Sequence, residues 1–125
     1  MKQQEFERVF SKLREILQKH SNVLNVSADR PNYYCLDIEF SPKLGKRLPV
    51  GWVKIGKNYV SYHFMPVYMF SDLREGLSKK LKVRMQGKSC FNFKSIDEPL
   101  FEELDQLTTK GLKISKKMGF TSESK

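Results

Sequence analysis

Two stretches near the ends of the chain carry hydrophobic residues at the spacing of an α-helix. In residues 3–20 the hydrophobic positions recur at steps of three and four, and charged residues fill the positions between them. This pattern predicts an amphipathic helix that packs on a core. The same stripe could dock a partner or lie on a membrane surface, but Glu5, Glu7 and Glu15 dilute the basic face that membrane-surface helices carry. The stripe consists of Phe6, Val9, Phe10, Leu13, Ile16 and Leu17.

A second amphipathic helix is expected at the other end of the chain, starting near residues 95–97. The sequence Ser-Ile-Asp-Glu offers a capping box there, and acidic residues at the start with lysines at the end suit the helix dipole without implying a function. We expect the last five residues, 121–125, to be a frayed tail. The hydrophobic stripe of this helix consists of Leu100, Phe101, Leu104, Leu107, Gly111, Ile114 and Met118.

Between these helices the pattern changes to the period of two that is typical of strands. Five strands are predicted, at residues 23–28, 33–40, 52–55, 58–64 and 88–95. Residues 41–51 contain two Pro and two Gly and predict a basic loop, and Gly56 and Lys57 predict a tight turn. Pro66 is expected to end the pairing of the fourth strand.

Residues 70–85 predict short helical turns, with Ser71 and Ser78 as caps and Gly76 as a break. The order is therefore one helix, four strands, a short helical segment, one strand and a long helix. This order predicts an α+β fold, with an antiparallel sheet of about five strands and the N- and C-terminal helices packed on one face. We expect a single domain over residues 1–120.

The composition supports a folded domain. The chain has 125 residues, of which 39% are hydrophobic and 12% aromatic, so it is long enough to bury one core. No apolar stretch approaches the roughly 20 residues that span a bilayer, and residues 1–10 lack the apolar core of a signal peptide, so a cytoplasmic location and no membrane partner are expected. Cys35 and Cys90 fit neither a disulfide framework nor a zinc motif, and we expect both to be reduced.

The alternation within the strands predicts which side chains lie inside. If both long helices cover one face of the sheet, that face buries Leu36, Ile38, Phe40, Val60, Tyr62, Phe64, Phe91 and Phe93. The opposite face could be plain solvated sheet, or residues 66–86 could fold over it and form a ligand pocket. That face would display Asp37, Glu39, Tyr59, Ser61, His63, Cys90, Asn92 and Lys94.

His63 is the first candidate for chemistry because its unperturbed pKa lies near 6.5. A single histidine in a strand is more often a hydrogen-bonded structural residue than a catalyst. His63 and Cys90 would resemble a base and its nucleophile only if the fifth strand lies beside the fourth. A metal site could draw on Asp37, Glu39, His63 and Cys90, but their spacing matches no metal signature. We expect no catalytic residues and no metal ligands.

The charge of the chain favours anionic partners. It has 23 Lys and Arg against 14 Asp and Glu, a formal net charge of +9 and a pI near 9.6. Such a balance attracts phosphates, acidic proteins or anionic membranes. Basic residues gather at residues 43–57 and 79–88, and Trp52, Tyr59 and Tyr68 offer aromatic surfaces, which together suit single-stranded nucleic acid. A run of lysines can also be a solvated surface, and no RNA-recognition, KH or helix-turn-helix pattern is present.

The element order and the stretches HFMPVY and KSCFNF resemble the YdhG-like domain family of small bacterial proteins. The resemblance implies an α+β sandwich related in shape to frataxin, and a role in handling iron, because some members are described as iron chaperones. Iron binding of the frataxin type uses acidic residues along the first helix and the neighbouring strand. This chain departs from that pattern, since its first helix mixes acidic residues with Lys2, Arg8, Lys12, Arg14 and Lys19.

The sequence therefore predicts a non-enzymatic domain that binds a small or anionic ligand on the sheet face. In this hypothesis Arg84 and Lys88 neutralise the anion, hydroxyl groups orient it, and His63 shares a proton with it. An iron-handling protein and a single-stranded nucleic-acid binder are the alternatives, and the ligand and the oligomeric state are left open. The predicted site consists of Tyr59, Ser61, His63, Tyr68, Arg84 and Lys88. The hypothesis requires His63 to face away from the helices, with Tyr62 and Phe64 inside.

Overall fold

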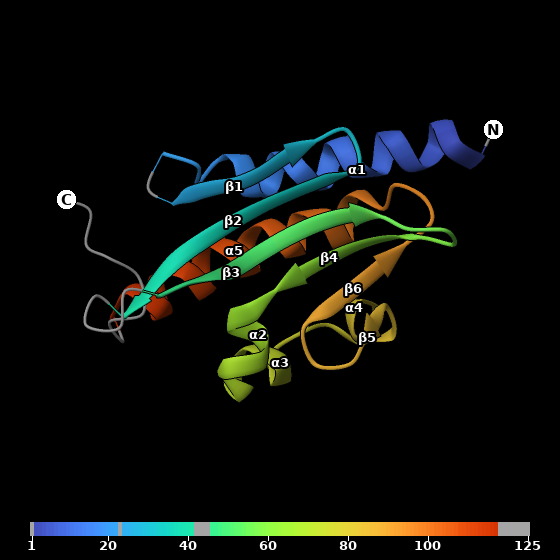
Figure 1. Ribbon diagram of the computed structural model, residues 1–125. Helices are drawn as coiled ribbons and strands as arrows, with labels where there is room; N and C mark the ends of the chain where they lie inside the picture. The colour runs from blue at the N-terminus through green and yellow to red at the C-terminus, as the bar shows by residue number, and fades with distance from the viewer. Residues whose placement is uncertain (1, 23, 42–45, 118–125) are drawn as a thin grey trace.

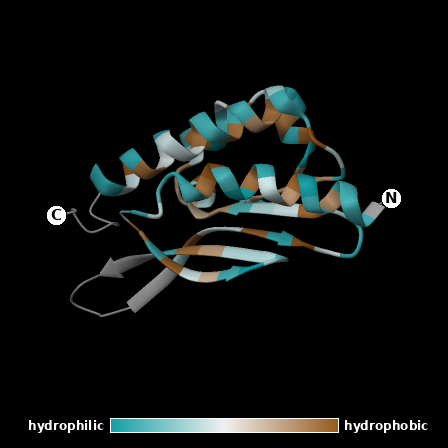
Figure 2. Cartoon of the chain, turned by 90° about the horizontal axis from the view of Figure 1, so that it is seen from above, coloured by the Kyte–Doolittle hydropathy of each residue, from teal (hydrophilic) through white to brown (hydrophobic). Residues whose placement is uncertain are grey.

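The computed structural model describes the backbone of residues 2–22, 24–41 and 46–117, and the side chains of these residues except 2, 38–41 and 46–48. In this part of the chain an antiparallel sheet of six strands carries its helices on one face (Figures 1 and 2). The elements in order are α1 (Lys2–Gln18), β1 (Asn25–Arg30), β2 (Tyr33–Ser41), β3 (Lys46–Ile55), β4 (Val60–Phe64), α2 (Met65–Met69), α3 (Ser71–Glu75), α4 (Lys79–Val83), β5 (Met85–Gln86), β6 (Cys90–Phe93) and α5 (Glu98–Lys117).

The sheet order is β1-β2-β3-β4-β6-β5, and every neighbouring pair is antiparallel. The first four strands form a meander, and β6 returns beside β4. Helices α1 and α5 lie side by side across one face of the sheet, α1 against β3 and β4 (Figure 1). The predicted α+β class and the placement of the two long helices are confirmed, but the expected number of about five strands is too low for the described residues.

Two corrections concern strand residues that the sequence pattern missed. Strand β3 begins at Lys46, within the predicted basic loop of residues 41–51. The pairing register shifts between Leu36 and Asp37 on β2, which pair with Gly51 and Pro49. A proline is tolerated in a strand beside such a β-bulge because no regular ladder bond is required of it. This segment thus has the composition of a loop, although its backbone pairs with β2.

The other missed strand is β5, whose first residue, Met85, is the last of the residues predicted to be helical. Met85 and Gln86 pair with Phe91 and Cys90 of β6. Gly87 has φ 78°, in the left-handed region that glycine adopts without steric penalty, so the chain can reverse tightly between the two strands. A pair of only two residues is too short to produce a recognisable alternation.

The helix boundaries confirm some of the expected caps. Strand β4 ends at Phe64 and α2 follows at once with Pro66 in its first turn, as expected for a proline that ends strand pairing. The Ser78 hydroxyl caps α4 by accepting from the Leu81 amide at 3.1 Å, and Gly76 ends α3. Ser71 is not a cap, because α3 has Phe70 at that position and no side-chain cap hydrogen bond.

The last helix begins slightly later than predicted. It starts at Glu98, and the carboxylate of Asp97 accepts from the Leu100 amide at 3.3 Å, so Asp97 rather than Ser95 supplies the cap. All six hydrophobic positions of the α1 stripe are buried, which confirms that this helix faces the core. On α5, residues 100, 101, 104, 107 and 111 are buried and Ile114 is half-buried. Met118 and the tail of residues 121–125 lie outside the described residues.

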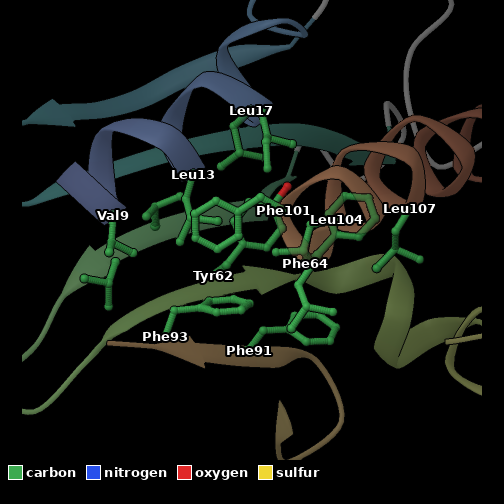
Figure 3. Close-up of a cluster of buried hydrophobic side chains, with 14 of the residues drawn as sticks. Val9, Leu13, Leu17, Tyr62, Phe64, Phe91, Phe93, Phe101, Leu104 and Leu107 are labelled. Atoms are coloured by element: carbon green, nitrogen blue, oxygen red, sulfur yellow. The ribbon is translucent and has the colours of Figure 1, made fainter. Parts of the chain in front are cut away.

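The core lies between the sheet and the two long helices (Figure 3). Figure 3 shows side chains of β4 and β6 facing those of α1 and α5. Six of the eight predicted inward positions on the strands are confirmed as buried, and the side chains of Ile38 and Phe40 are outside the described set. The confirmed positions are Leu36, Val60, Tyr62, Phe64, Phe91 and Phe93.

The short helices α2, α3 and α4 extend this helical layer. Leu73, Leu77 and Leu81 are buried in the same core as the long helices. The Ser78 amide and hydroxyl donate to the two carboxylate oxygens of Glu103 on α5, at 2.9 and 2.7 Å. The segment therefore packs beside α5 and does not form a roof over the opposite face of the sheet.

Candidate functional site

The face of the sheet opposite α1 and α5 is called here the open face. On β4 the side chains of Val60, Tyr62 and Phe64 are fully buried, whereas Ser61 and His63 are only partly buried on the other side. The inward and outward positions of β4 are therefore as the alternation predicted. Cross-strand pairing places the following side chains on the open face: Tyr33, Trp52, Lys54, Ser61, His63, Gln86, Cys90 and Asn92.

His63 lies in the middle of this face, between an aromatic ring and a thiol. Its ring stacks on Trp52 of β3, with ring centroids 4.9 Å apart and planes 12° from parallel. Its Nδ1 is 3.1 Å from the Ser89 hydroxyl oxygen and 3.4 Å from the Cys90 Sγ. Strand β6 thus lies beside β4, which meets the condition that the sequence set for a contact between His63 and Cys90. Burial lowers the pKa of His63, which favours the neutral imidazole.

The two cysteines have different environments. Cys90 is half-buried on the open face, where burial raises the pKa of its thiol and the Ser89 hydroxyl opposes part of that rise. Cys35 is only 2% exposed, and burial raises the pKa of its thiol as well. Both are free cysteines.

A chain of hydrogen bonds crosses the open face at β4, β6 and β5. The Ser61 hydroxyl donates to the Asn92 side-chain oxygen at 2.7 Å, and the Asn92 amide donates to the Gln86 side-chain oxygen at 2.8 Å. The Tyr59 hydroxyl donates to the same Gln86 oxygen at 3.0 Å. The Tyr59 and Ser61 hydroxyls therefore already have partners within the protein. Sequence reasoning missed Gln86 because the two residues of β5 gave no strand signal.

The structure brings only part of the predicted site together. Tyr59, Ser61 and His63 share the open face. Lys88 is exposed in the turn between β5 and β6. Arg84 is also exposed, and its backbone carbonyl accepts from the backbone amide of Asn92 at 2.8 Å. Both residues therefore lie near the margin of the open face. Tyr68 lies on α2, in the helical layer, and is 60% exposed. The pocket considered for these residues required the segment 66–86 to cover the open face, whereas that segment packs beside α5.

Aromatic side chains form a continuous row on the open face. Tyr33 of β2 lies 6.3 Å from Trp52 between ring centroids, with the planes tilted by 49°, and Trp52 stacks on His63. Tyr33 was not among the predicted site residues. Its outward position follows from the alternation in β2, but its proximity to Trp52 depends on the pairing register, which the sequence does not contain.

Basic side chains flank this row. Lys54 pairs across the sheet with both Tyr33 and Ser61, and Arg30 pairs with Tyr33 from β1. Both cations are exposed. Ion pairs are formed by other cations, on α1 and directly after it: Arg8 with Glu5, Lys12 with Glu98, Arg14 with Asp29 and Lys19 with Asp105.

The described part of the chain shows neither a metal-ligand cluster nor a membrane-spanning helix. No group of three or more His, Cys, Asp or Glu side chains there is arranged to hold a metal ion. No helix there is long and apolar enough to cross a membrane.

Comparison with known proteins gives no relative for this chain. It matches no protein-family model, and no curated protein or solved structure is significantly similar to it. The resemblance to the YdhG-like family, the frataxin-like shape and the role in iron handling therefore stay predictions.

Proposed function

We propose that this chain is a non-enzymatic binding domain that holds single-stranded nucleic acid on its open face. One observation carries the proposal: the aromatic row of Tyr33, Trp52 and His63 lies on a sheet face that no described helix covers, with Lys54 and Arg30 beside it (Figure 2). Aromatic rings that stack on bases, interleaved with cations that neutralise phosphates, are typical of proteins that bind single strands without strict sequence preference.

The ring geometry leaves surface for a base. Because the planes of Tyr33 and Trp52 are tilted by 49°, these rings do not stack on each other. Tyr33 therefore keeps ring surface that the stack of Trp52 on His63 does not occupy. Stacking of a base on an aromatic side chain contributes about 1–3 kcal/mol. Lys54 lies on β3, directly across from Tyr33 on β2, and is exposed. It can therefore contact a phosphate of the nucleic acid whose base stacks on Tyr33.

A small anion bound in a pocket has weaker support. Such sites are concave and enclose most of the ligand, and the segment that could have enclosed one packs beside α5. The hydroxyls expected to orient an anion, those of Tyr59 and Ser61, donate to Gln86 and Asn92 instead. A single-stranded nucleic acid that lies across the open face requires neither a covering segment nor free hydroxyl groups.

The decisive experiment uses the fact that Trp52 is the single tryptophan of the chain. Titration with an unlabelled oligonucleotide of about 12 nucleotides, within the usual site sizes for such domains, should change the Trp52 fluorescence at low salt. Inorganic phosphate at the same ionic strength serves as the comparison. A response to phosphate equal to that of the oligonucleotide would favour the small-anion hypothesis, and no response to either would contradict the proposal.

Variants locate the binding face. Anisotropy of a labelled oligonucleotide should show weaker binding by Tyr33→Ala and Trp52→Ala, by roughly 5- to 150-fold if each ring stacks with one base. Lys113→Gln is the matched control, because Lys113 is exposed on α5, in the layer on the other side of the sheet. Circular dichroism melting curves should establish that each variant is folded. Equal loss in all three variants would exclude the open face as the specific site.

A further inference from the structure

The strongest cluster of reactive groups lies at the end of the aromatic row and consists of Cys90, His63 and Ser89. The His63 Nδ1 lies 3.4 Å from the Cys90 Sγ and 3.1 Å from the Ser89 hydroxyl oxygen. All three side chains are partly buried, so the cluster is accessible from one side only. A thiol in contact with an imidazole is the arrangement of a nucleophile and its base.

Burial keeps the pair uncharged at rest, so the proton has to move as the sulfur attacks and not before. Burial raises the pKa of the Cys90 thiol and lowers the pKa of His63, so the resting pair at neutral pH is a protonated thiol beside a neutral imidazole. In that state Nδ1 can accept the thiol proton. The Ser89 hydroxyl can then donate to the thiolate, which is why it partly opposes the rise in the pKa of Cys90.

We propose that Cys90 is a site of thiol–disulfide exchange with low-molecular-weight disulfides, and that His63 is the base for this exchange. The Cys90 thiol gives its proton to His63 Nδ1 while its sulfur attacks one sulfur of the disulfide. A new S–S bond forms to Cys90, the original S–S bond breaks, and the released thiolate takes the proton from His63. The disulfide is the only oxidant, and the products are a mixed disulfide and one free thiol.

The second cysteine provides a contrast within the same chain. Cys35 is 2% exposed, and its Sγ contacts the Leu36 carbonyl oxygen at 3.9 Å and an Asp37 carboxylate oxygen at 3.7 Å. No imidazole contacts it among the described residues. Burial raises the pKa of its thiol, hydrogen bonds with Ser27 and Tyr33 oppose part of that rise, and the Asp37 carboxylate adds to it. Reactivity of a cysteine follows its accessibility and the ease of forming the thiolate. Exchange is therefore expected at Cys90 and not at Cys35.

The adduct would affect the open face. Cys90 pairs across the sheet with His63, which stacks on Trp52, so a mixed disulfide at Cys90 would lie beside the aromatic row. An acidic adduct such as glutathione would add negative charge there and weaken binding of a nucleic acid. This consequence rests on the proposed function, whereas the exchange chemistry does not.

Incubation of the folded protein with oxidised glutathione, followed by intact-mass measurement and peptide mapping, tests the site. Wild type and Cys35→Ser should each gain one glutathione adduct at Cys90, and Cys90→Ser should gain none. His63→Phe keeps an aromatic ring for Trp52 but has no base, and should react at least about tenfold more slowly. An adduct mainly on Cys35, or an equal rate in His63→Phe, would overturn the proposal.

The same reactions in urea separate the role of the base from effects of peptide sequence. In the unfolded chain His63 no longer contacts Cys90, so wild type and His63→Phe should react at the same rate. A tenfold difference that persists in urea would overturn the assignment of His63 as the base.

Binding of the labelled oligonucleotide before and after glutathionylation tests the consequence, with dithiothreitol to reverse the adduct. If glutathionylation weakens binding and dithiothreitol restores the original affinity, the predicted effect of the adduct on the open face is supported. An adduct that leaves the affinity unchanged overturns the consequence but not the exchange site. If unmodified protein does not bind at all, the proposed function fails and the mass measurement still decides the exchange site.

Discussion

At the scale of single residues, the core contains a hydrogen bond between two hydroxyl groups that are both removed from solvent. Tyr62 on β4 and Thr108 on α5 are each 0% exposed, and their oxygens lie 2.5 Å apart. Burial raises the pKa of Tyr62 far above its usual range, so its hydroxyl stays protonated. This bond links the sheet to the last helix at a position where either residue alone would leave a polar atom in an apolar environment.

Tyr62→Phe should lower the free energy of unfolding by about 1–3 kcal/mol, because it leaves the Thr108 hydroxyl buried without Tyr62 as its partner. The double variant Tyr62→Phe/Thr108→Val should recover part of that loss, since both polar groups are then removed. Urea unfolding of wild type, the two single variants and the double variant gives the coupling energy, expected to exceed about 0.5 kcal/mol. Strictly additive effects would show that the bond does not stabilise the fold.

The two histidines predict how stability changes with pH. Burial lowers the pKa of His63, and burial is also the largest cause of the lowered pKa of His20, with Lys19 lowering it further and Asp105 opposing. The Nε2 of His20 is buried without a hydrogen-bond partner among the described residues. Both pKa values lie below the 6.5 of an unperturbed histidine, so near and below that pH the unfolded chain binds more protons than the folded one.

The free energy of unfolding should therefore fall as the pH is lowered from about 7.5 to about 5.5. His20→Asn and His63→Phe should each make this dependence shallower, because each removes one group that must bind a proton on unfolding. Urea unfolding at several pH values measures the slope. A stability that rises as the pH falls over this range would contradict the burial of both imidazoles.

At the scale of secondary-structure elements, Gly111 fixes how closely α5 approaches the sheet. A Cβ atom at this position would lie 2.5 Å from Cε2 and 2.9 Å from Cζ of Phe64, and 3.2 Å from Cβ of Pro66. Glycine inside a helix normally lowers stability by about 0.5–1 kcal/mol relative to alanine. Here the absence of a side chain makes room for the Phe64 ring. The packing gained by bringing α5 close to β4 offsets the stability lost through the weak helix propensity of glycine.

Gly111→Ala should lower the melting temperature, because overpacking of a core costs about 1–3 kcal/mol, more than the gain in helix propensity. Gly76→Ala is the matched control: its φ is −82°, and the nearest atom to an added Cβ is the Asp72 carbonyl oxygen at 3.5 Å, an ordinary contact. That variant should be close to neutral. A Gly111→Ala variant more stable than wild type would mean that α5 can shift away from Phe64 at little cost.

The elements also show where sequence reasoning succeeds and where it fails. The long helices were predictable because each repeats its hydrophobic positions over four turns or more, and the outward position of His63 followed from the alternation in β4. The first half of β3 was missed because its Pro and Gly residues lie beside a bulge, where regular pairing is relaxed. The neighbours of His63 could not be predicted, because Trp52 and Cys90 reach it only through a register that pairing across the sheet defines.

At the scale of the whole molecule, the formal net charge of +9 does not by itself distinguish a specific anion site from general attraction. Arg8, Lys12, Arg14 and Lys19, on α1 and directly after it, form ion pairs, whereas Lys54 and Arg30 are exposed beside the aromatic row. A phosphate contact on the open face should therefore be separable from the charge of the molecule as a whole. The dependence of binding on salt provides that separation.

For single strands, log K falls with log salt concentration with a slope of about −0.7 for each phosphate neutralised. Lys54→Gln should therefore make the slope shallower by about 0.7, whereas Lys113→Gln, which removes the same charge from the other side of the molecule, should leave it unchanged. Trp52→Ala should weaken binding at every salt concentration with the slope of wild type, because stacking releases no counterions. Anisotropy titrations of a labelled oligonucleotide at several salt concentrations give all three slopes. If Lys54→Gln and Lys113→Gln change the slope equally, the strand is held by the net charge of the protein, and the open face has no particular role in binding it.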